Sequence, residues 1–182
     1  MPVDAHRHHR RSIRLPGHDY VGGVYFITVC AHDRACLFGA IENGTVTLSE
    51  MGQMVEEEWV RSAQIRSELT IDTFVVMPNH VHGIVVLHAA HAGEGAGMRA
   101  PTLLLRRPRS LGSFIAGFKA ATTKRINALR STPGAPVWQR NYDEHIIRTE
   151  RAWGVIRQYI MTNPQHWEQD REHPDRQHPP QR

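Results

Sequence analysis

The stretch "VVMPNHVHGIVV", residues 75–86, constrains the fold more than any other part of this chain. It is rich in β-branched residues, which favours a strand, and it carries His80 and His82 on either side of a single valine. Side chains two positions apart on a strand point to the same face of a sheet. We therefore expect the two imidazoles to stand side by side, with the valine turned away.

The strand that carries the histidines follows another apolar strand at 69–76. Met77, Pro78 and Asn79 join the two, and because Pro and Asn suit a tight turn, we expect the strands to pair antiparallel. The other segments with regular patterns are a strand at 24–31, a hairpin about Asn43-Gly44, a helix from Ser49 to about 67, a helix after Ser110, a short strand within 137–148, and a helix that begins after Thr149 and ends at Pro164.

The order of these elements predicts an α+β fold. Strand, helix, strand, strand, helix, strand is the order of a ferredoxin-like antiparallel sheet, with helices on one face. The last helix is an addition to that plan and carries Tyr159. We expect one domain over residues 20–168, preceded by a basic N-terminal arm at 1–19 and followed by a polar, mobile tail at 169–182.

Composition limits the classes of protein to consider. The chain has 182 residues, of which 40% are hydrophobic, enough for one core. It has no run of about 20 apolar residues and no signal peptide, so we expect a cytoplasmic protein that does not enter a membrane. Its 22 Lys and Arg against 18 Asp and Glu favour a polyanionic partner, although solvated surfaces explain the same excess.

Two neutral imidazoles on one strand face can bind a divalent cation. In a chain with 13 histidines such spacing also arises by chance, and the pair is then structural. Asn163 offers a third ligand, because its amide oxygen suits Mg²⁺ or Mn²⁺. Tyr159, four residues earlier on the same helix face, would stand beside it, placed to attack a phosphorus atom. The alternative is a packing tyrosine followed by an asparagine that caps the helix.

Three motifs in a fixed order suggest a family. "MPNHVHGIVV", a basic helix, "WQRNYDEHIIR" and "YIMTNP" together resemble the IS200-like single-tyrosine HUH transposases, specifically the REP-associated tyrosine transposase branch, over residues 20–168. The resemblance implies that His80, His82 and Asn163 are metal ligands and that Tyr159 is the nucleophile. Tyr142 in "RNYDEH" is a rival nucleophile, but its motif resembles the strand that precedes the catalytic helix.

The resemblance also implies a reaction and a substrate. The reaction is cleavage and rejoining of single-stranded DNA through a 5′-phosphotyrosine intermediate, with Mg²⁺ or Mn²⁺ and without ATP. The substrate is hairpin DNA of the REP-like palindromic kind. The REP-associated branch further implies a monomer with its site completed within one chain, which we favour over a dimer that exchanges the tyrosine helix. A tyrosine with a pKa near 10 needs help to ionise, and the sequence does not name the base.

Clusters of basic residues are predicted to contact DNA phosphates. They are Arg7, Arg10, Arg11 and Arg14 in the arm, Arg106, Arg107 and Arg109 in a long loop at 89–109, and Lys119, Lys124 and Arg125 in the basic helix. Trp138, Trp153 and Trp167 are candidates for stacking on unpaired bases, with packing in the core as the alternative. The long loop matches no motif of the family.

Three other functions are compatible with the same residues. The first is a non-catalytic relative that only binds hairpin DNA. The second is a zinc hydrolase in which Asp143 or Glu144 joins the two histidines and leaves a position open for water. The third is a plain interaction module with incidental histidines.

Overall fold

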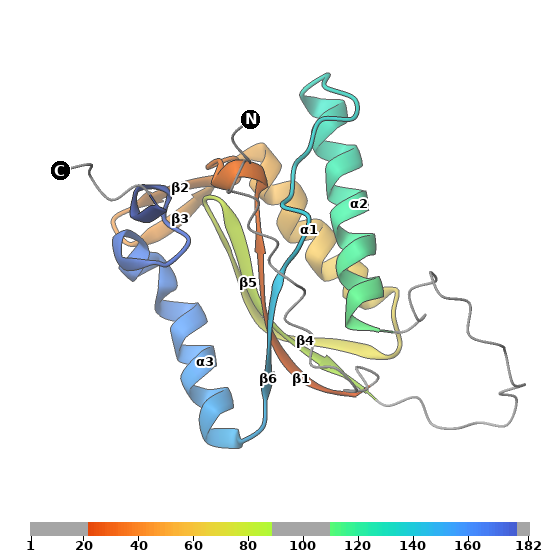
Figure 1. The fold of residues 1–182 in the computed structure, drawn as a ribbon, viewed down its shortest axis with the longest axis vertical. Coiled ribbons are helices and arrows are strands. Elements are labelled where there is room, and N and C mark those ends of the chain that lie inside the picture. Colours follow the sequence, from red (N-terminus) through yellow and green to blue (C-terminus); the bar gives the residue numbers. More distant parts are fainter. Residues whose placement is uncertain (1–21, 89–109, 178–182) are drawn as a thin grey trace, which may run out of the picture.

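The computed structural model describes residues 22–88 and 110–177, and its centre is a four-stranded antiparallel sheet (Figure 1). The strands lie in the order β4-β5-β1-β6. Their bounds are β1 Gly23–Cys30, β4 Leu69–Met77, β5 His80–Leu87 and β6 Asp143–Ile147. With helix α1 (Glu50–Gln64) between β1 and β4 in sequence, and α2 (Leu111–Leu129) between β5 and β6, this is the predicted ferredoxin-like topology.

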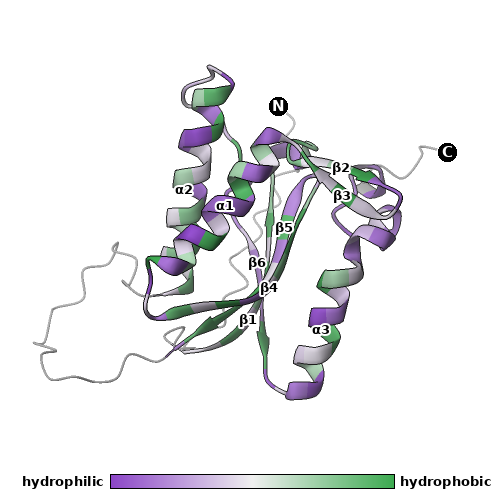
Figure 2. Ribbon diagram, turned by 180° about the vertical axis from the view of Figure 1, so that it is seen from behind, coloured by the Kyte–Doolittle hydropathy of each residue, from purple (hydrophilic) through white to green (hydrophobic). Residues whose placement is uncertain are grey.

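Helices cover both faces of the sheet, as Figures 1 and 2 show from opposite sides. Helices α1 and α2 pack together on one face, where Trp59 meets the rings of Phe114 and Phe118. The added helix α3 (Glu150–Thr162) lies on the other face, where Ile160 packs on Ile84 of β5. The expectation of an extra helix that carries Tyr159 is confirmed.

The helix ends and the hairpin follow local sequence signals. Ser110 and Thr149 cap their helices as predicted, and Ser49 caps α1; each accepts a hydrogen bond from a backbone N–H of the first turn. Strands β2 (Gly39–Glu42) and β3 (Thr45–Leu48) form the hairpin, and Asn43 and Gly44 take the positive φ angles of its turn, 52° and 74°.

Side chains along a strand point alternately to the two faces of the sheet, and this decides which of them meet α3. Val81 and Val85 of β5 point into the core under α1 and α2. Gly83 lies between them, and a Cβ there would come within 2.7 Å of the Trp59 ring, so the strand can pack this closely only with glycine. His80 and His82 point to the opposite face, where Nε2 of His82 lies 3.3 Å from the Tyr159 hydroxyl of α3.

The chain after α3 turns back toward the sheet. It forms short 3₁₀ helices at η2 (Asn163–Gln169) and η3 (Pro174–Gln177). Between them Asp170 and Glu172 are both 4% exposed. The expectation of a polar, mobile tail from Gln169 is therefore wrong for residues 169–177, because two of its acidic side chains are buried against the domain. None of the described helices is long and apolar enough to cross a bilayer.

Candidate metal and tyrosine site

The two histidines of β5 stand side by side, as the strand period requires. His80 and His82 are 0% and 3% exposed, and their ring centroids are 4.3 Å apart. The antiparallel register places Thr28 of β1 opposite His82. The Thr28 hydroxyl and Nδ1 of His82 share a hydrogen bond of 2.9 Å, which leaves Nε2 facing α3.

Asn79 fixes the His80 ring. The Asn79 amide nitrogen donates to the carbonyl oxygens of Arg34 and Glu172, at 3.1 and 2.8 Å. Its Oδ1 is therefore an acceptor, and Nδ1 of His80 donates to it over 2.8 Å. Nε2 of neutral His80 then carries a lone pair and no proton. Burial, followed by the charge of His82, holds the pKa of His80 well below its usual range, which favours this neutral form.

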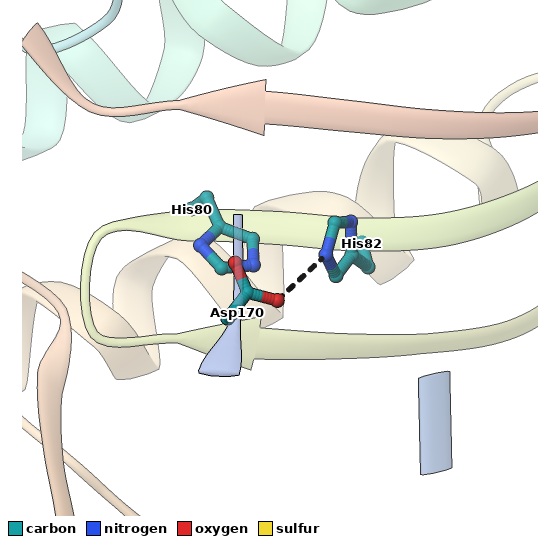
Figure 3. A group of neighbouring side chains, drawn as sticks. All are labelled: His80, His82 and Asp170. Carbon is teal, nitrogen blue, oxygen red and sulfur yellow. Dashed lines mark ion pairs between the residues drawn. The ribbon is translucent and has the colours of Figure 1, made fainter. Parts of the chain in front are cut away.

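Asp170 joins the histidines from the segment after α3. Ligand atoms of His80, His82 and Asp170 all lie within 4.8 Å of one another, and Oδ2 of Asp170 is 3.7 Å from Nε2 of His82 (Figure 3). Burial by itself would raise the pKa of Asp170, but hydrogen bonding with His82 and Asn163 outweighs it and holds the pKa well below its usual range. Asp170 is therefore a buried carboxylate with its charge retained.

Tyr159 brings a hydroxyl to this group from α3. Its Oη lies 3.3 Å from Nε2 of His82 and donates to Oδ2 of Asp170 over 3.2 Å. The residue is 42% exposed, so it is partly open to solvent. Burial and the negative charge of Asp170 raise the pKa of Tyr159, which keeps the hydroxyl protonated in the absence of added positive charge.

Asn163 lies one turn beyond Tyr159 and is 2% exposed. Its amide nitrogen donates to Asp170 over 2.7 Å, while its Oδ1 is buried without a hydrogen-bond partner among the described residues. Nε2 of His80 is likewise buried and unpartnered in the part of the chain that the structure describes. These two buried acceptor atoms have no hydrogen-bond donor within the described ranges and lie beside a carboxylate. Together they form a set of ligands that fits a divalent cation.

The site opens through a groove of about 430 Å³. Its walls come from β1, β5, β6, α3 and the segment after α3. The side chains that line it include Phe26, Thr28, His82, Asp143, His145 and Tyr159.

The structure thus brings together four of the predicted site residues, namely His80, His82, Tyr159 and Asn163. Asp170 was not predicted, because it follows a 3₁₀ segment without periodicity and was assigned to the tail. Asn79 and Thr28 were not predicted either, although the strand register points to Thr28. The rival Tyr142 packs against the core under α1 and α2, on the other face of the sheet from the histidines.

The predicted DNA contacts that fall within the described residues do not lie at this site. Lys119, Lys124 and Arg125 lie on α2, across the sheet from α3. Lys119 donates to two backbone carbonyls, those of Gln139 and Asn141, and Arg125 pairs with Glu57 and Glu58 of α1. The predicted arm and loop arginines, Arg7, Arg10, Arg11, Arg14, Arg106, Arg107 and Arg109, lie outside the described residues.

The three tryptophans have packing roles. Trp138 is 7% exposed, lies in the main core and donates to the Thr122 hydroxyl. Trp153 donates from α3 to Asp72 of β4, and the ring of Trp167 lies 6.0 Å from that of His80.

Comparison with known proteins agrees with this fold. No protein-family model matches the chain. A Haemophilus influenzae protein described as uncharacterized is 40% identical over 168 residues, which cover 90% of this chain and 92% of the relative. The solved structure of a REP-associated tyrosine transposase bound to a REP hairpin is 22% identical with a TM-score of 0.58, over 82% of this chain and 72% of that one. The chain therefore belongs to one family with the Haemophilus influenzae protein, and its fold is that of the REP-associated tyrosine transposase.

Proposed function

We propose that this protein is a transposase of the HUH tyrosine type, a metal-dependent enzyme that cleaves and rejoins single-stranded DNA at hairpins. The observation that carries the proposal is the position of the Tyr159 hydroxyl, 3.3 Å from His82 and beside a buried group of two imidazoles and one carboxylate. A nucleophile next to a cation site is the arrangement that phosphodiester cleavage needs.

The reaction is a transesterification. Tyr159 Oη forms a bond to the scissile phosphorus while the bond from phosphorus to the 3′ oxygen breaks, which leaves a 5′-phosphotyrosine and a 3′-hydroxyl. Asp170 accepts a hydrogen bond from the Tyr159 hydroxyl, and because the pKa of Asp170 is held low, the tyrosine proton passes on to water. The leaving 3′ oxygen takes up a proton from water. One ester bond replaces another, so attack by a 3′-hydroxyl reverses the step without ATP.

His80, His82 and Asp170 would hold the cation, with the free Oδ1 of Asn163 as a further ligand. Mg²⁺ or Mn²⁺ suits the oxygen ligands. Such an ion supplies positive charge that offsets the developing negative charge on the phosphate and the tyrosine oxygen. The chain's own part is to orient the ligands, through Asn79 for His80 and Thr28 for His82.

We further propose hairpin DNA of the REP type as partner, because the REP-associated transposase of the same fold was solved with a REP hairpin. The basic arm, the loop arginines and the helix α2 cations remain the proposed phosphate contacts. We also propose that the site is completed within one chain. Asp72 of β4 accepts hydrogen bonds from Trp153 and Arg157 of α3, which fastens the tyrosine helix to its own sheet.

The test is cleavage of labelled single-stranded hairpins with Mg²⁺ or Mn²⁺, followed by analysis of the protein for attached DNA. We expect an adduct with the wild type and none with Tyr159→Phe or without metal. Tyr142→Phe is the matched control, since its ring lies across the sheet, and it should form the adduct as the wild type does. Binding without any adduct would point to a non-catalytic hairpin binder instead.

The donor set also favours one other function. Two histidines and a carboxylate are the ligands of many catalytic zinc sites, in which a water occupies the open position. The carboxylate of the described cluster is Asp170, and not the Asp143 or Glu144 considered from the sequence. A zinc hydrolase would keep its activity in Tyr159→Phe, whereas the transposase would lose it.

A further inference from the structure

We propose that the groove beside Tyr159 binds one unpaired nucleotide next to the scissile phosphate, and that Asp143 selects against thymine at this position. The inference rests on the proposed function and adds a base preference to it. Tyr159, which carries the attacking hydroxyl, lines the groove together with His82. A nucleotide joined to the phosphate under attack would therefore reach the groove first.

The strand register places the residues that would contact this base. Asp143 of β6 pairs with Thr28 of β1, and His145 pairs with Phe26. Directly opposed residues of an antiparallel pair point to the same face. Asp143 and His145 therefore stand on the face that carries the site, in line with Thr28, which holds His82.

Phe26 and His145 provide surfaces for the flat face of a base. The Phe26 ring lies 5.2 Å from the His82 ring and meets the Tyr159 ring edge-on at 6.0 Å. His145 is exposed at the rim. Stacking on aromatic side chains tolerates every base, since each has a π face, and so these two residues bind without selecting.

Asp143 would distinguish between the bases. An ionised carboxylate only accepts hydrogen bonds. Adenine, cytosine and guanine each present an exocyclic amine on the Watson–Crick edge, whereas thymine presents only its N3–H there, flanked by two carbonyl oxygens that a carboxylate repels. A negative charge beside a phosphate site would by itself weaken DNA binding. Hydrogen bonds from a base amine would offset this cost at Asp143, which lines the groove together with Glu144, Glu172 and Arg171.

The size of the groove agrees with one nucleotide. About 430 Å³ lies in the lower part of the range of about 300–1,000 Å³ found for pockets that hold small ligands. A duplex would not enter such a groove, so the base must be unpaired.

The test measures binding without chemistry. Fluorescence anisotropy with EDTA present compares hairpins whose short single-stranded flank carries each of the four bases at each position in turn. For the wild type we expect thymine at one flank position to weaken binding about tenfold relative to the best base, in line with the discrimination of one good base contact. Asp143→Asn, whose amide can donate to a thymine carbonyl, should remove that penalty at this position alone.

Asp175→Asn is the matched control, because it makes the same change at a carboxylate that is 92% exposed and outside the groove. It should keep the wild-type preference. Identical base profiles for the wild type and Asp143→Asn, or no binding of the single-stranded flank, would overturn the inference. The adduct assay reports on Tyr159 separately, so cleavage with an unchanged base profile would reject this subsite and leave the proposed function intact.

Discussion

The Tyr159 hydroxyl donates a hydrogen bond to Oδ2 of Asp170, 3.2 Å away, from a helix to the segment that follows it. The same carboxylate oxygen accepts from Asn163 and lies 3.7 Å from His82. One buried carboxylate thus connects the proposed nucleophile with the proposed ligands. The segment after α3 is therefore part of the site and not an appendage to it.

Asp170→Asn should weaken metal binding while the fold is kept. The change removes the charge but keeps an oxygen that can accept from Tyr159 and Asn163. We expect the affinity for Mn²⁺ to fall at least about tenfold in isothermal titration calorimetry, since the loss of even indirect metal contacts commonly costs 10–100-fold. Glu168→Gln, exposed on the same segment, should bind Mn²⁺ as the wild type does. Equal affinity in Asp170→Asn would exclude Asp170 from the metal site.

Asn79→Ala should lower both stability and metal affinity. Asn79 is 0% exposed, and its loss leaves two backbone carbonyls and Nδ1 of His80 without their partner. Each buried group left unsatisfied costs about 1–3 kcal/mol, so urea unfolding should show a loss of at least about 2 kcal/mol. The exposed Asn141→Ala is the control and should change little. An unaltered free energy of unfolding in Asn79→Ala would contradict this account of His80.

The sequence predicts the parts of the site that depend on local geometry. His80 and His82 share a face because a strand has a period of two, and Tyr159 and Asn163 share one because a helix repeats near four residues. The helix caps and the Asn43-Gly44 turn follow from equally local rules.

The parts that depend on long-range packing are not visible in the sequence. Asp170 reaches the histidines only because the chain reverses after Pro164, and no periodicity signals that reversal. Arg125 counts as a free cation in a charge pattern, yet the packing of α1 on α2 supplies Glu57 and Glu58 as its partners. Charge placement along a chain therefore indicates a possible partner but not whether each charge is available to it.

The two cysteines should differ sharply in reactivity. Cys30 is 6% exposed and its thiol donates to Glu172 over 3.3 Å, whereas Cys36 is exposed. Burial and the charge of Glu172 raise the pKa of Cys30, which suppresses the reactive thiolate. A thiol reagent should modify one cysteine in the native protein and both in urea, and Cys36→Ser should remove the fast reaction. Rapid modification of both in the native state would mean that the segment bearing Glu172 does not cover Cys30.

The contact that fastens α3 should make stability depend on pH in the acid range. The hydrogen bond from Arg157, aided by that from Trp153, holds the pKa of Asp72 below its ordinary value of 3.8. A lowered carboxyl pKa adds stability that is fully present above the ordinary value and is lost as the pH falls toward the folded one. The difference in unfolding free energy between the wild type and Asp72→Asn should be constant above about pH 5 and shrink below about pH 4. A difference that grew in acid would refute the pairing.

The tyrosine and the histidines should act within one chain. Ile160 of α3 is fully buried on the sheet of its own chain, and Asp72 binds the same helix through Arg157. A mixture of Tyr159→Phe and His80→Ala should therefore form no more DNA adduct than either variant alone, while wild type added to either variant restores it. Sedimentation gives a check that needs no activity, with the mass of one 20.7 kDa chain expected. Adduct formation in the mixture, together with a mass of two chains, would show that α3 is exchanged between partners.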